Sequence, residues 1–204
     1  MNNYACGVTQ KMENKTVLVV GGAGAVGSQL VNTLTKICKK VVVLDNLSSG
    51  YLFLLEKTKN LFFINGDIRN DHDLRKCFNE KPDIVFHLAA FFANQKSIEY
   101  PIEDLSVNGV GTLKLFNHCV EYGNLQKVVY ASSRAVYGNL PTPYTEESID
   151  PLNLTTPYQI TKMLGESYGK YFINQYDLPV CSARFFNSFG PGEVPGNYRN
   201  VIPN

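Results

Sequence analysis

The sequence predicts an α/β fold, in which helices cover both faces of a parallel, doubly wound sheet. Short apolar runs rich in β-branched residues alternate with helical stretches along most of the chain. Strands of parallel sheets, which are buried on both faces, typically read as such continuous apolar runs. The chain has 204 residues, 44% of them hydrophobic and 18% charged, which suits one globular domain with a substantial core.

Three strands and two helices are expected in the first part of the chain. Residues 16–20 (TVLVV), 41–45 (VVVLD) and 61–64 (LFFI) are short apolar runs, and the first ends at a glycine. Apolar residues recur at helical spacing over residues 24–38, and residues 71–79 form a second helical stretch. The order so far is strand, helix, strand, strand, helix.

Three further strands and two long helices are expected in the second part. The strands cover residues 83–87, 127–131 and 179–185, and the helices cover residues 102–122 and 158–175. The start of the last helix is well specified: Thr156 suits the N-cap, Pro157 the first helical position, and Gln159 completes a capping box.

Two segments interrupt this alternation. Residues 138–156 form a long loop with three prolines, and loops of this length are usually functional. Residues 187–204 are rich in Gly, Pro and Asn and open like the start of another region. We therefore expect a polar tail over residues 1–15, a cofactor-binding domain over residues 16–186, and a truncated substrate-binding region over residues 187–204.

Charge and composition exclude several classes of protein. With 19 basic and 18 acidic residues and no basic cluster, the chain is not expected to bind nucleic acid. No apolar run approaches the ~18 residues that span a bilayer, and residues 1–14 lack the apolar core of a signal peptide. The five scattered cysteines indicate reduced thiols in a cytoplasmic protein, without disulfides or a metal site.

The glycine motif GGAGAVG at residues 21–27 follows a strand and opens a helix. In that setting Gly21 permits the tight turn, Gly24 lets a pyrophosphate approach the backbone, and Gly27 lets the helix pack on the strand. The free N–H groups of the helix then meet the anion. Asp45 ends the next strand, where a carboxylate accepts hydrogen bonds from ribose hydroxyls and repels a 2′-phosphate. The sequence thus predicts a Rossmann fold that prefers NAD to NADP.

A second motif supplies acid–base chemistry. Tyr158 and Lys162 are four residues apart and share one helix face. A nearby ammonium favours the phenolate, so we expect Lys162 to lower the pKa of Tyr158. Ser132 and Ser133 follow the strand at 127–131, at the edge of the sheet where ligands bind, and a serine hydroxyl there can hold a substrate oxygen. His87, by contrast, ends a buried strand and is expected to be a packed, hydrogen-bonded histidine.

Taken together, these motifs resemble the extended short-chain dehydrogenase/reductases, and among them the NAD-dependent epimerase/dehydratase family that acts on nucleotide sugars. The resemblance runs from residue 16 to residue 204. It rests on the glycine motif, DNLSSG at 45–50, GDI at 66–68, HLAA at 87–90, the serine pair, the Tyr–Lys pair and RFFN at 184–187.

The resemblance implies a role for each matching residue. It assigns proton transfer and substrate contact to Ser133, Tyr158 and Lys162, and further substrate contacts to Asn187 and Asn200. The residues that it assigns to the cofactor are Gly21, Gly24, Ala25, Val26, Gly27, Asp45, Asn46, Asp67, Ile68, Leu88, Ala89, Ala90, Asn108, Tyr158, Lys162 and Phe186. It also implies a homodimer that packs the helices at 102–122 and 158–175 into a four-helix bundle.

The family hosts several reactions on one site, and two positions discriminate between them. The dehydratases carry Asp-Glu, and the decarboxylases a Glu, where this chain has Arg134 and Ala135. A small residue at 135 resembles the epimerases, so we expect epimerisation of a nucleotide sugar at C4 through a transient keto-sugar. Two alternatives remain: a dehydratase or decarboxylase, and a truncated NAD-binding module without turnover, because the family usually runs much longer than this chain.

Overall fold

The computed structural model describes residues 11–195, and its centre is one six-stranded sheet. All neighbouring strands pair in parallel, in the order β3-β2-β1-β4-β5-β6. The strands are β1 (Thr16–Val20), β2 (Lys40–Asp45), β3 (Leu61–Asn65), β4 (Ile84–His87), β5 (Lys127–Ser133) and β6 (Val180–Phe185). This order is that of the doubly wound dinucleotide-binding fold, so the predicted fold class is confirmed.

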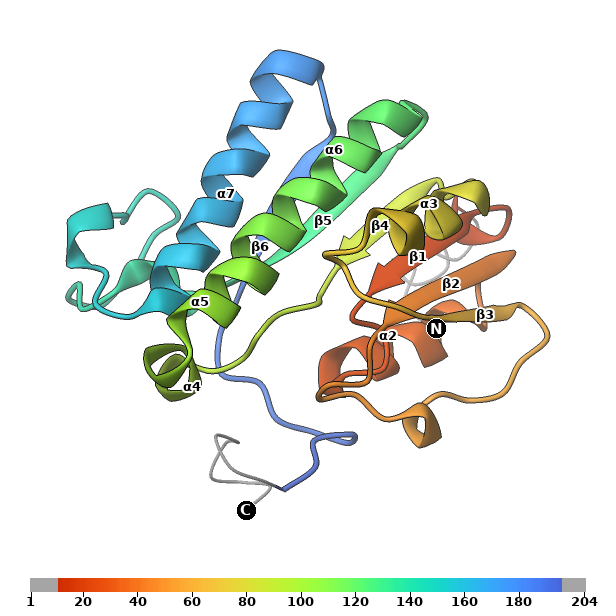
Figure 1. Cartoon of the computed structure of the whole chain (residues 1–204), viewed down its shortest axis with the longest axis horizontal. Helices are drawn as coiled ribbons and strands as arrows, with labels where there is room; N and C mark the ends of the chain where they lie inside the picture. Colours follow the sequence, from red (N-terminus) through yellow and green to blue (C-terminus); the bar gives the residue numbers. More distant parts are fainter. Residues whose placement is uncertain (1–10, 196–204) are drawn as a thin grey trace.

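Helical segments connect these strands (Figure 1). The α-helices are α2 (Ala25–Leu34), α3 (Asp71–Asn79), α4 (Asn94–Glu99), α5 (Pro101–Asp104), α6 (Thr112–Tyr122) and α7 (Pro157–Tyr176). A π-helical segment, η2 (Leu105–Gly111), joins α5 to α6. The short 3-10 segments are η1 (Leu52–Leu54), η3 (Arg134–Tyr137) and η4 (Pro151–Asn153). The helix predicted at 102–122 is thus a continuous helical run with a widened middle, whereas α4 was not predicted.

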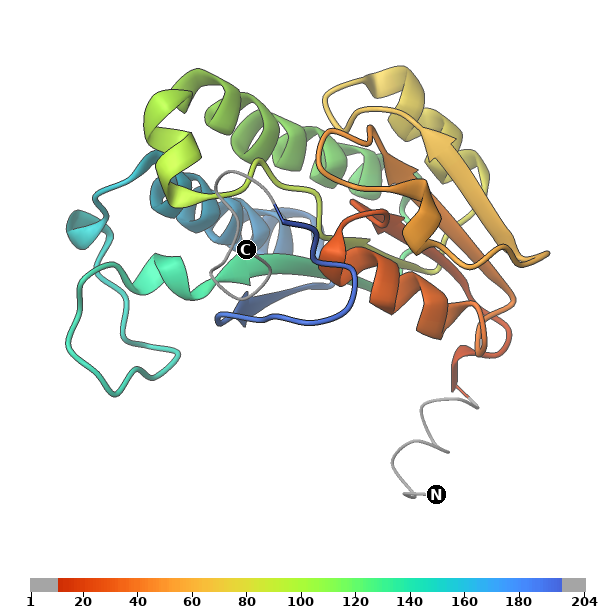
Figure 2. The ribbon, with the colours of Figure 1, turned by 90° about the horizontal axis from the view of Figure 1, so that it is seen from below.

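The two faces of the sheet are covered unequally (Figure 2). Helices α3, α6 and α7 lie on one face, and α2 lies on the other, below β1 and β2. The two edge strands are also less buried than predicted, because each has a neighbouring strand on one side only: Phe62 on β3 is 44% exposed, and Cys181 and Ser182 on β6 are exposed. The expectation that every strand is buried on both faces holds only for the middle of the sheet.

Two predicted boundaries need correction. The helix predicted over residues 24–38 ends at Leu34, because the N–H groups of Lys36 and Ile37 turn to carbonyls only three residues back, those of Thr33 and Leu34. Strand β5 continues through Ser133, since its register with β6 pairs Ser133 with Phe185. Ser132 and Ser133 are thus the last residues of the strand and do not belong to the loop after it.

A glycine sets the spacing between α7 and the sheet. A Cβ atom at Gly165 would lie 2.1 Å from the phenol oxygen of Tyr130 on β5. Tyr130 is 1% exposed, and its hydroxyl donates to the Lys162 carbonyl at 3.4 Å. The helix can approach the strand this closely only because residue 165 has no side chain. As a result the first turns of α7 lie directly over the end of β5.

Two further findings concern the chain as a whole. Among residues 11–195, no helix combines the length and apolar character that crossing a bilayer requires. The cysteines at 38, 77, 119 and 181 are all free, and the first three are buried. Burial raises the pKa of Cys38 to about 11 and that of Cys77 to about 12, so these thiols stay protonated at neutral pH.

Candidate active site

A cavity of about 210 Å³ lies beyond the carboxyl ends of β1, β2, β3 and β4, at the point where the strand order reverses. Open α/β sheets bind their ligands at this edge. Nine of the residues expected to contact the cofactor line the cavity: Gly21, Gly24, Asp45, Asn46, Asp67, Ile68, Leu88, Ala89 and Ala90. Ser48, from the DNLSSG motif, also lines it, and its lining residues that the sequence did not single out include Arg69, Phe91, Phe92, Lys96 and Glu103.

The turn after β1 forms a cradle of bare backbone. Gly21 has φ +85°, and a Cβ atom there would lie 2.4 Å from the Ala89 nitrogen. At Gly27, a Cβ atom would meet the Gly21 oxygen at 2.2 Å. Gly24 is the N-cap of α2, and no side chain caps that helix. The backbone N–H groups of the first turn therefore remain available to an anion, as the glycine motif predicted.

The remaining residues of the motif lie in the first turn of α2. Ala25 and Val26 follow the N-cap, and Val26 is 45% exposed. Neither these two nor Gly27 is a lining residue of the cavity. Their predicted contact with a pyrophosphate therefore depends on backbone N–H groups at the mouth of the cavity.

Asp45 is held by the backbone at the end of β2. Its two carboxylate oxygens accept N–H groups from Ala23 at 2.9 Å and from Leu47 at 2.8 Å. Each oxygen keeps a second lone pair that can accept a ribose hydroxyl. The carboxylate is thus fixed in place and still able to bind, in the position where it would repel a 2′-phosphate.

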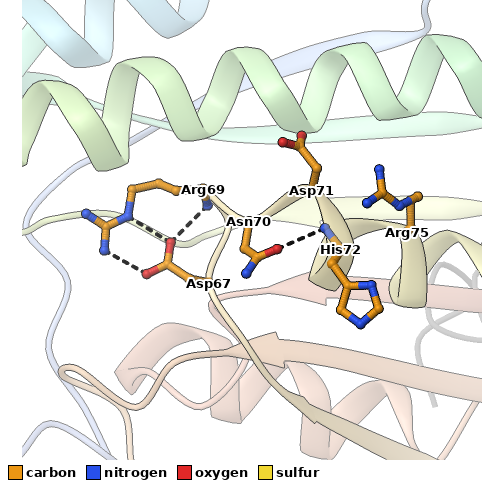
Figure 3. A pocket seen from close by; sticks show the side chains of 6 residues that line it. All are labelled: Asp67, Arg69, Asn70, Asp71, His72 and Arg75. Atoms are coloured by element: carbon orange, nitrogen blue, oxygen red, sulfur yellow. Dashed lines mark hydrogen bonds and ion pairs between the residues drawn. The ribbon is translucent and has the colours of Figure 1, made fainter.

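Asp67 is engaged by a cation that the sequence did not single out. Arg69 donates to both carboxylate oxygens of Asp67, at 2.9 and 2.7 Å (Figure 3). Asn46 adds a third hydrogen bond to Asp67, of 2.9 Å. The bonds from Arg69 are the main reason that the pKa of Asp67 falls to about 2. The other end of the guanidinium donates to Glu103 at 2.8 Å. Arg69 therefore links the end of β3 to α5 and closes one side of the cavity.

A second, shallow hollow of about 460 Å³ lies beside the first, at the start of α3. Figure 3 shows its six lining residues: Asp67, Arg69, Asn70, Asp71, His72 and Arg75. Asn70 serves there as the N-cap of α3, because its side chain accepts the His72 N–H at 2.9 Å. The hollow is thus the outer surface of the Asp67–Arg69 pair and of a capped helix.

The loop after β4 forms the opposite wall of the cavity. The N–H groups of Leu88 and Ala89 both donate to the Val20 carbonyl at 2.8 Å, which fixes where the loop begins. Asn108, buried in the π-helical segment, accepts the Phe91 N–H at 2.8 Å and donates to the Phe91 carbonyl at 3.1 Å. The predicted Asn108 therefore supports the cavity wall from behind and does not line the cavity.

Tyr158, Lys162 and Ser133 come together as predicted. Tyr158 and Lys162 are both buried on α7, and the Lys162 ammonium donates to the Ala131 carbonyl of β5 at 2.9 Å. Tyr158 and Ser133 are joined by a side-chain hydrogen bond. The ring of Phe92, which lines the cavity, meets the Tyr158 ring edge-to-face at 6.2 Å between centroids. This contact connects the three residues to the cavity.

Helix α7 begins where the sequence predicted. Thr156 and Gln159 form the complete capping box, with Pro157 in the first helical position. The unpredicted helix α4 adds a further support, since Ser97 accepts the Tyr158 N–H at 3.1 Å. Tyr158 therefore lies in the first turn of a helix whose N-terminal N–H groups are bound both by its own capping box and by Ser97 of α4.

The pKa of Tyr158 differs from the prediction. Burial raises it to about 12, and the hydrogen bond with Ser133 opposes that rise. Lys162 is not among the causes; burial lowers the pKa of Lys162 itself to about 8. The predicted lowering of the Tyr158 pKa is therefore wrong for this structure, because burial disfavours the charged phenolate and this effect outweighs that of the neighbouring groups. Ser133 is the residue that favours the phenolate.

Ser132 serves a different purpose from Ser133. Its hydroxyl donates to the Glu166 carboxylate, which also forms a two-pronged ion pair with Arg184 at 2.9 and 2.8 Å. Arg184 additionally donates to the Tyr137 hydroxyl at 3.1 Å and to the Glu146 carbonyl at 2.8 Å. One guanidinium thereby ties β6, α7 and the loop at 138–156 together beside Ser133.

The residues that the resemblance assigns to the substrate are only partly among the described residues. Arg134 donates through Nε to the Asn187 side-chain oxygen at 3.4 Å, so two residues far apart in the chain meet beside Ser133. Phe186 is 53% exposed, and its ring lies 6.1 Å from that of Tyr137. The predicted residue Asn200 lies outside the described residues. Neither Phe186 nor Asn187 lines the cavity.

His87 is a packed histidine, as expected. It is 1% exposed, and its Nε2 lies 2.8 Å from the Thr112 hydroxyl. Because that hydroxyl donates to the Asn108 carbonyl at 2.6 Å, Nε2 is the ring nitrogen that carries hydrogen. Burial lowers the pKa of His87 to about 3, so the ring is neutral at any physiological pH.

A glycine cradle, an acid at the end of β2 and a buried Tyr–Lys pair beside a serine define a dinucleotide-binding protein equipped for proton transfer. Comparison with known proteins narrows this class. Residues 17–204 match the family model described as the NAD dependent epimerase/dehydratase family, and the chain belongs to that family. The family's description names the cofactor that the glycine motif and Asp45 predicted.

Several relatives are epimerases. A curated UDP-glucose 4-epimerase of Mycolicibacterium smegmatis is 37% identical over 190 residues, which cover 91% of this chain and 60% of that protein. The structure of an epimerase from Methanothermobacter thermautotrophicus is 49% identical, with a TM-score of 0.95, and the match covers 98% of this chain and 60% of the other. A UDP-N-acetylglucosamine 4-epimerase of Methanobrevibacter ruminantium, solved with UDP-N-acetylmuramic acid, is 38% identical, with a TM-score of 0.87 and coverage of 94% and 61%.

One relative has a different reaction. A curated UDP-N-acetyl-alpha-D-glucosaminuronate decarboxylase of Bacillus cytotoxicus is 32% identical over 194 residues, which cover 93% of this chain and 59% of that protein. Similarity alone therefore does not select one chemistry. The chain also spans only about 60% of the length of the curated relatives it matches.

Proposed function

We propose that the protein catalyses NAD-dependent epimerisation of a nucleotide sugar at C4, through a transient keto-sugar. The observation that carries the proposal is the composition of the segment after Ser133. Arg134 stands there with its guanidinium turned to Asn187, and Ala135 is buried. No carboxylate occupies either position, so the acid and base that eliminate water, or the acid of the decarboxylases, have no counterpart at these two positions.

The residues around the cavity fit NAD. Side chains at Gly21 and Gly27 would fill the backbone cradle, and the Asp45 carboxylate keeps lone pairs for ribose hydroxyls. Gly24, Ala25 and Val26 would hold the pyrophosphate through backbone N–H groups, and Asp67 and Ile68 would flank the adenine. Lys162 would bind the nicotinamide ribose, with Ala89, Ala90 and Phe186 nearby. When bound, NAD supplies a hydride acceptor that can return the hydride to the opposite face of the sugar.

Tyr158 performs the proton transfers in this mechanism. In the oxidising half, its phenolate takes the proton of the sugar 4-hydroxyl, and the Ser133 hydroxyl holds the same sugar oxygen. The hydrogen bond from Ser133 favours that phenolate against the effect of burial. In the reducing half, the protonated phenol returns its proton to the keto oxygen. The raised pKa of Tyr158 means that the reducing half begins from the protonation state that the structure favours.

The substrate site is proposed to continue from Ser133 towards Arg134 and Asn187. These two side chains meet at 3.4 Å, and Arg134 adds a cation where the diphosphate of a nucleotide sugar would approach. Asn200 is proposed as a further contact of the nucleotide. The division into a tail, a cofactor domain at 16–186 and a substrate region from 187 onward is proposed on the same grounds.

We further propose a cytoplasmic homodimer. The helices that would pack into the four-helix bundle carry exposed apolar side chains, among them Ile102 at 78%, Leu105 at 45%, Val110 at 46% and Ile160 at 52% exposure. Burying such side chains against a second copy is favourable. Light scattering of the purified protein tests this proposal, and a monomeric mass at micromolar concentration would contradict it.

The reaction is tested by incubating the complete protein with UDP-glucose, with UDP-N-acetylglucosamine and with a UDP-uronate in deuterated water. A 4-epimerase yields an isomer of unchanged mass, because the migrating hydrogen stays with the cofactor and never exchanges with solvent. Loss of water from the sugar would show a dehydratase, and loss of carbon dioxide from a uronate would show a decarboxylase. Deuterium at C4 would refute the hydride route. NAD binding without any conversion would favour a binding module.

A further inference from the structure

Asp104 is a buried carboxylate that none of the motifs explains. It ends helix α5 and is 0% exposed. Its two oxygens accept hydrogen bonds from the Thr161 hydroxyl at 2.6 Å and from the Asn108 amide at 2.9 Å. No ion pair joins it to a cation within residues 11–195. Burying a carboxylate without such a pair costs folding free energy. A residue kept in spite of that cost is a candidate for a role in the active site.

The first hydrogen bond acts on helix α7. Thr161 precedes Lys162, and its hydroxyl also lies 3.3 Å from the Tyr158 carbonyl. The bond from Thr161 to Asp104 therefore fixes the rotation of the helical turn that carries both Tyr158 and Lys162. The two residues of the proton-transfer pair are oriented from α5, through a contact between residues 57 positions apart in the chain.

The second hydrogen bond acts on the cofactor cavity. Asn108 uses its amide nitrogen towards Asp104, which leaves its oxygen facing the Phe91 N–H at 2.8 Å. The same amide nitrogen donates to the Phe91 carbonyl at 3.1 Å. Because the ionised Asp104 carboxylate is only an acceptor, it holds the amide nitrogen of Asn108 in the orientation that pairs both ends of the amide with Phe91. The wall of the cavity at Phe91 and Phe92 is held through that amide.

The charge of Asp104 acts on Lys162. The other titratable groups around the ammonium are Tyr130 on β5, whose ring centroid lies 5.3 Å away, Tyr158 on α7 and His87 on β4. Burial raises the pKa of both phenols and lowers that of His87, so all three are neutral at pH 7. Within the described chain, Asp104 is thus the acid that raises the pKa of Lys162 against the effect of burial. Burial raises the pKa of Asp104 itself, and the hydrogen bonds from Thr161 and Asn108 together with the charge of Lys162 oppose that rise.

We propose that Asp104 is a positioning residue for the active site, which orients Thr161 and Asn108 through its two oxygens and keeps the buried Lys162 ammonium charged. Helix α5, which lies behind the cavity wall, thus contributes Asp104 to the support of the active site. Only its kinetic consequences depend on the proposed epimerase function; the charge state of Lys162 does not.

Asp104→Asn separates charge from packing. An amide has the same shape as the carboxylate, and its oxygen can accept from Asn108 while its nitrogen donates to the Thr161 hydroxyl. That hydroxyl can in turn donate to the Tyr158 carbonyl, so every hydrogen bond is replaced and only the negative charge is lost. Glu121→Gln is the matched control, because it neutralises a largely exposed acid on α6, away from Lys162.

The titration of Lys162 is measured directly, by the pH dependence of its ¹³Cε chemical shift in the 204-residue chain, assigned with Lys162→Met. In the wild type we expect a midpoint below that of the surface lysines. Asp104→Asn should shift this midpoint further towards low pH, so that the acid dissociation constant of Lys162 rises tenfold or more. Glu121→Gln should leave the midpoint unchanged. An unchanged midpoint in a folded Asp104→Asn variant would overturn the proposal.

Activity of the complete protein provides the second readout. If Asp104 keeps Lys162 charged, the ratio of the Asp104→Asn rate to the wild-type rate should rise at least fivefold as the pH falls from 8 to 6. A purely structural defect would give a ratio that does not depend on pH and would contradict the electrostatic part of the proposal. If the protein shows no epimerase activity at all, the proposed function fails while the ¹³C titration still decides the assignment of Asp104.

Discussion

Gly165 allows α7 to lie directly against Tyr130, and Gly165→Ala measures how far the site depends on that contact. Alanine has the better helix propensity, by about 1 kcal/mol in a helix interior. The added Cβ atom would, however, lie 2.1 Å from the Tyr130 oxygen and 2.3 Å from its Cζ atom, where ordinary contacts begin at 3.4 Å. Tyr130 is enclosed by the rings of His87 and Phe116, so it cannot turn aside.

The helix must therefore move outward by roughly 1 Å or more. Overpacking of this kind costs up to about 3 kcal/mol, which leaves a net loss of about 2 kcal/mol after the gain in propensity. In a domain of this size such a loss lowers Tm by roughly 4–8 °C. The same shift would stretch the 2.9 Å bond from Lys162 to the Ala131 carbonyl, and a displacement of about 1 Å can reduce kcat by about 100-fold.

Gly169→Ala is the control, because it changes the same residue type one turn later in α7. A Cβ atom there meets only a methyl group of Val180, at 3.2 Å, so stability should rise or stay within about 1 kcal/mol. Thermal unfolding of both variants, and the kcat of both in the complete protein, form the assay. Equal Tm values for the two variants, or a Gly165→Ala protein with normal kcat, would refute the reasoning.

Three further outcomes are expected. Isothermal titration should show that the chain binds NAD more tightly than NADP. Asp45→Asn should reduce the ratio of the two dissociation constants about tenfold or more. Equal affinities in the wild type would sink this prediction. Tyr158→Phe should keep NAD affinity within about threefold and reduce kcat of the complete protein by at least 100-fold, since only the phenol oxygen is lost; most of kcat surviving would contradict it. Asp67→Asn should flatten the acid side of the stability curve. The folded pKa of Asp67, about 2, lies below its ordinary 3.8, so the wild type has this stability above pH 4 and loses it as the pH falls to 2. An unchanged slope between pH 4 and pH 2 would argue against the ion pair with Arg69.

The sheet and the glycine cradle could be predicted because their signals are local. The run at 16–20, Gly21 and the acid at 45 each depend on a few adjacent residues, and the structure places all of them as expected. The exposure of Phe62 on β3 could not be predicted in the same way. The apolar residue pattern of a strand is the same in the middle of a sheet and at its edge. The strand order depends on pairing between strands that are far apart in the sequence.

The residues that support the site from behind could not be predicted from the sequence for a related reason. Arg69 and Asp104 have no distinctive neighbours in sequence, and part of their hydrogen bonding reaches residues 34 and 57 positions away, in Glu103 and Thr161. The pKa of Tyr158 was misjudged because spacing along a helix reports which residues share a face and carries no information on burial. The function of the Tyr–Lys pair was predicted from that spacing together with the family resemblance of the other motifs.

The π-helical segment at 105–111 has a consequence for how this helix could change in evolution. A π-turn holds one more residue than an α-turn, so it amounts to a single-residue insertion within the run from α5 to α6. Deleting one residue between Asn108 and Thr112 would restore a regular helix, but would rotate one part against the other by about 100°. Asn108 could then no longer face Phe91 while Thr112 faces His87. A change of length by one residue in this segment would therefore uncouple the cavity wall at Phe91 from the buried His87 in the core.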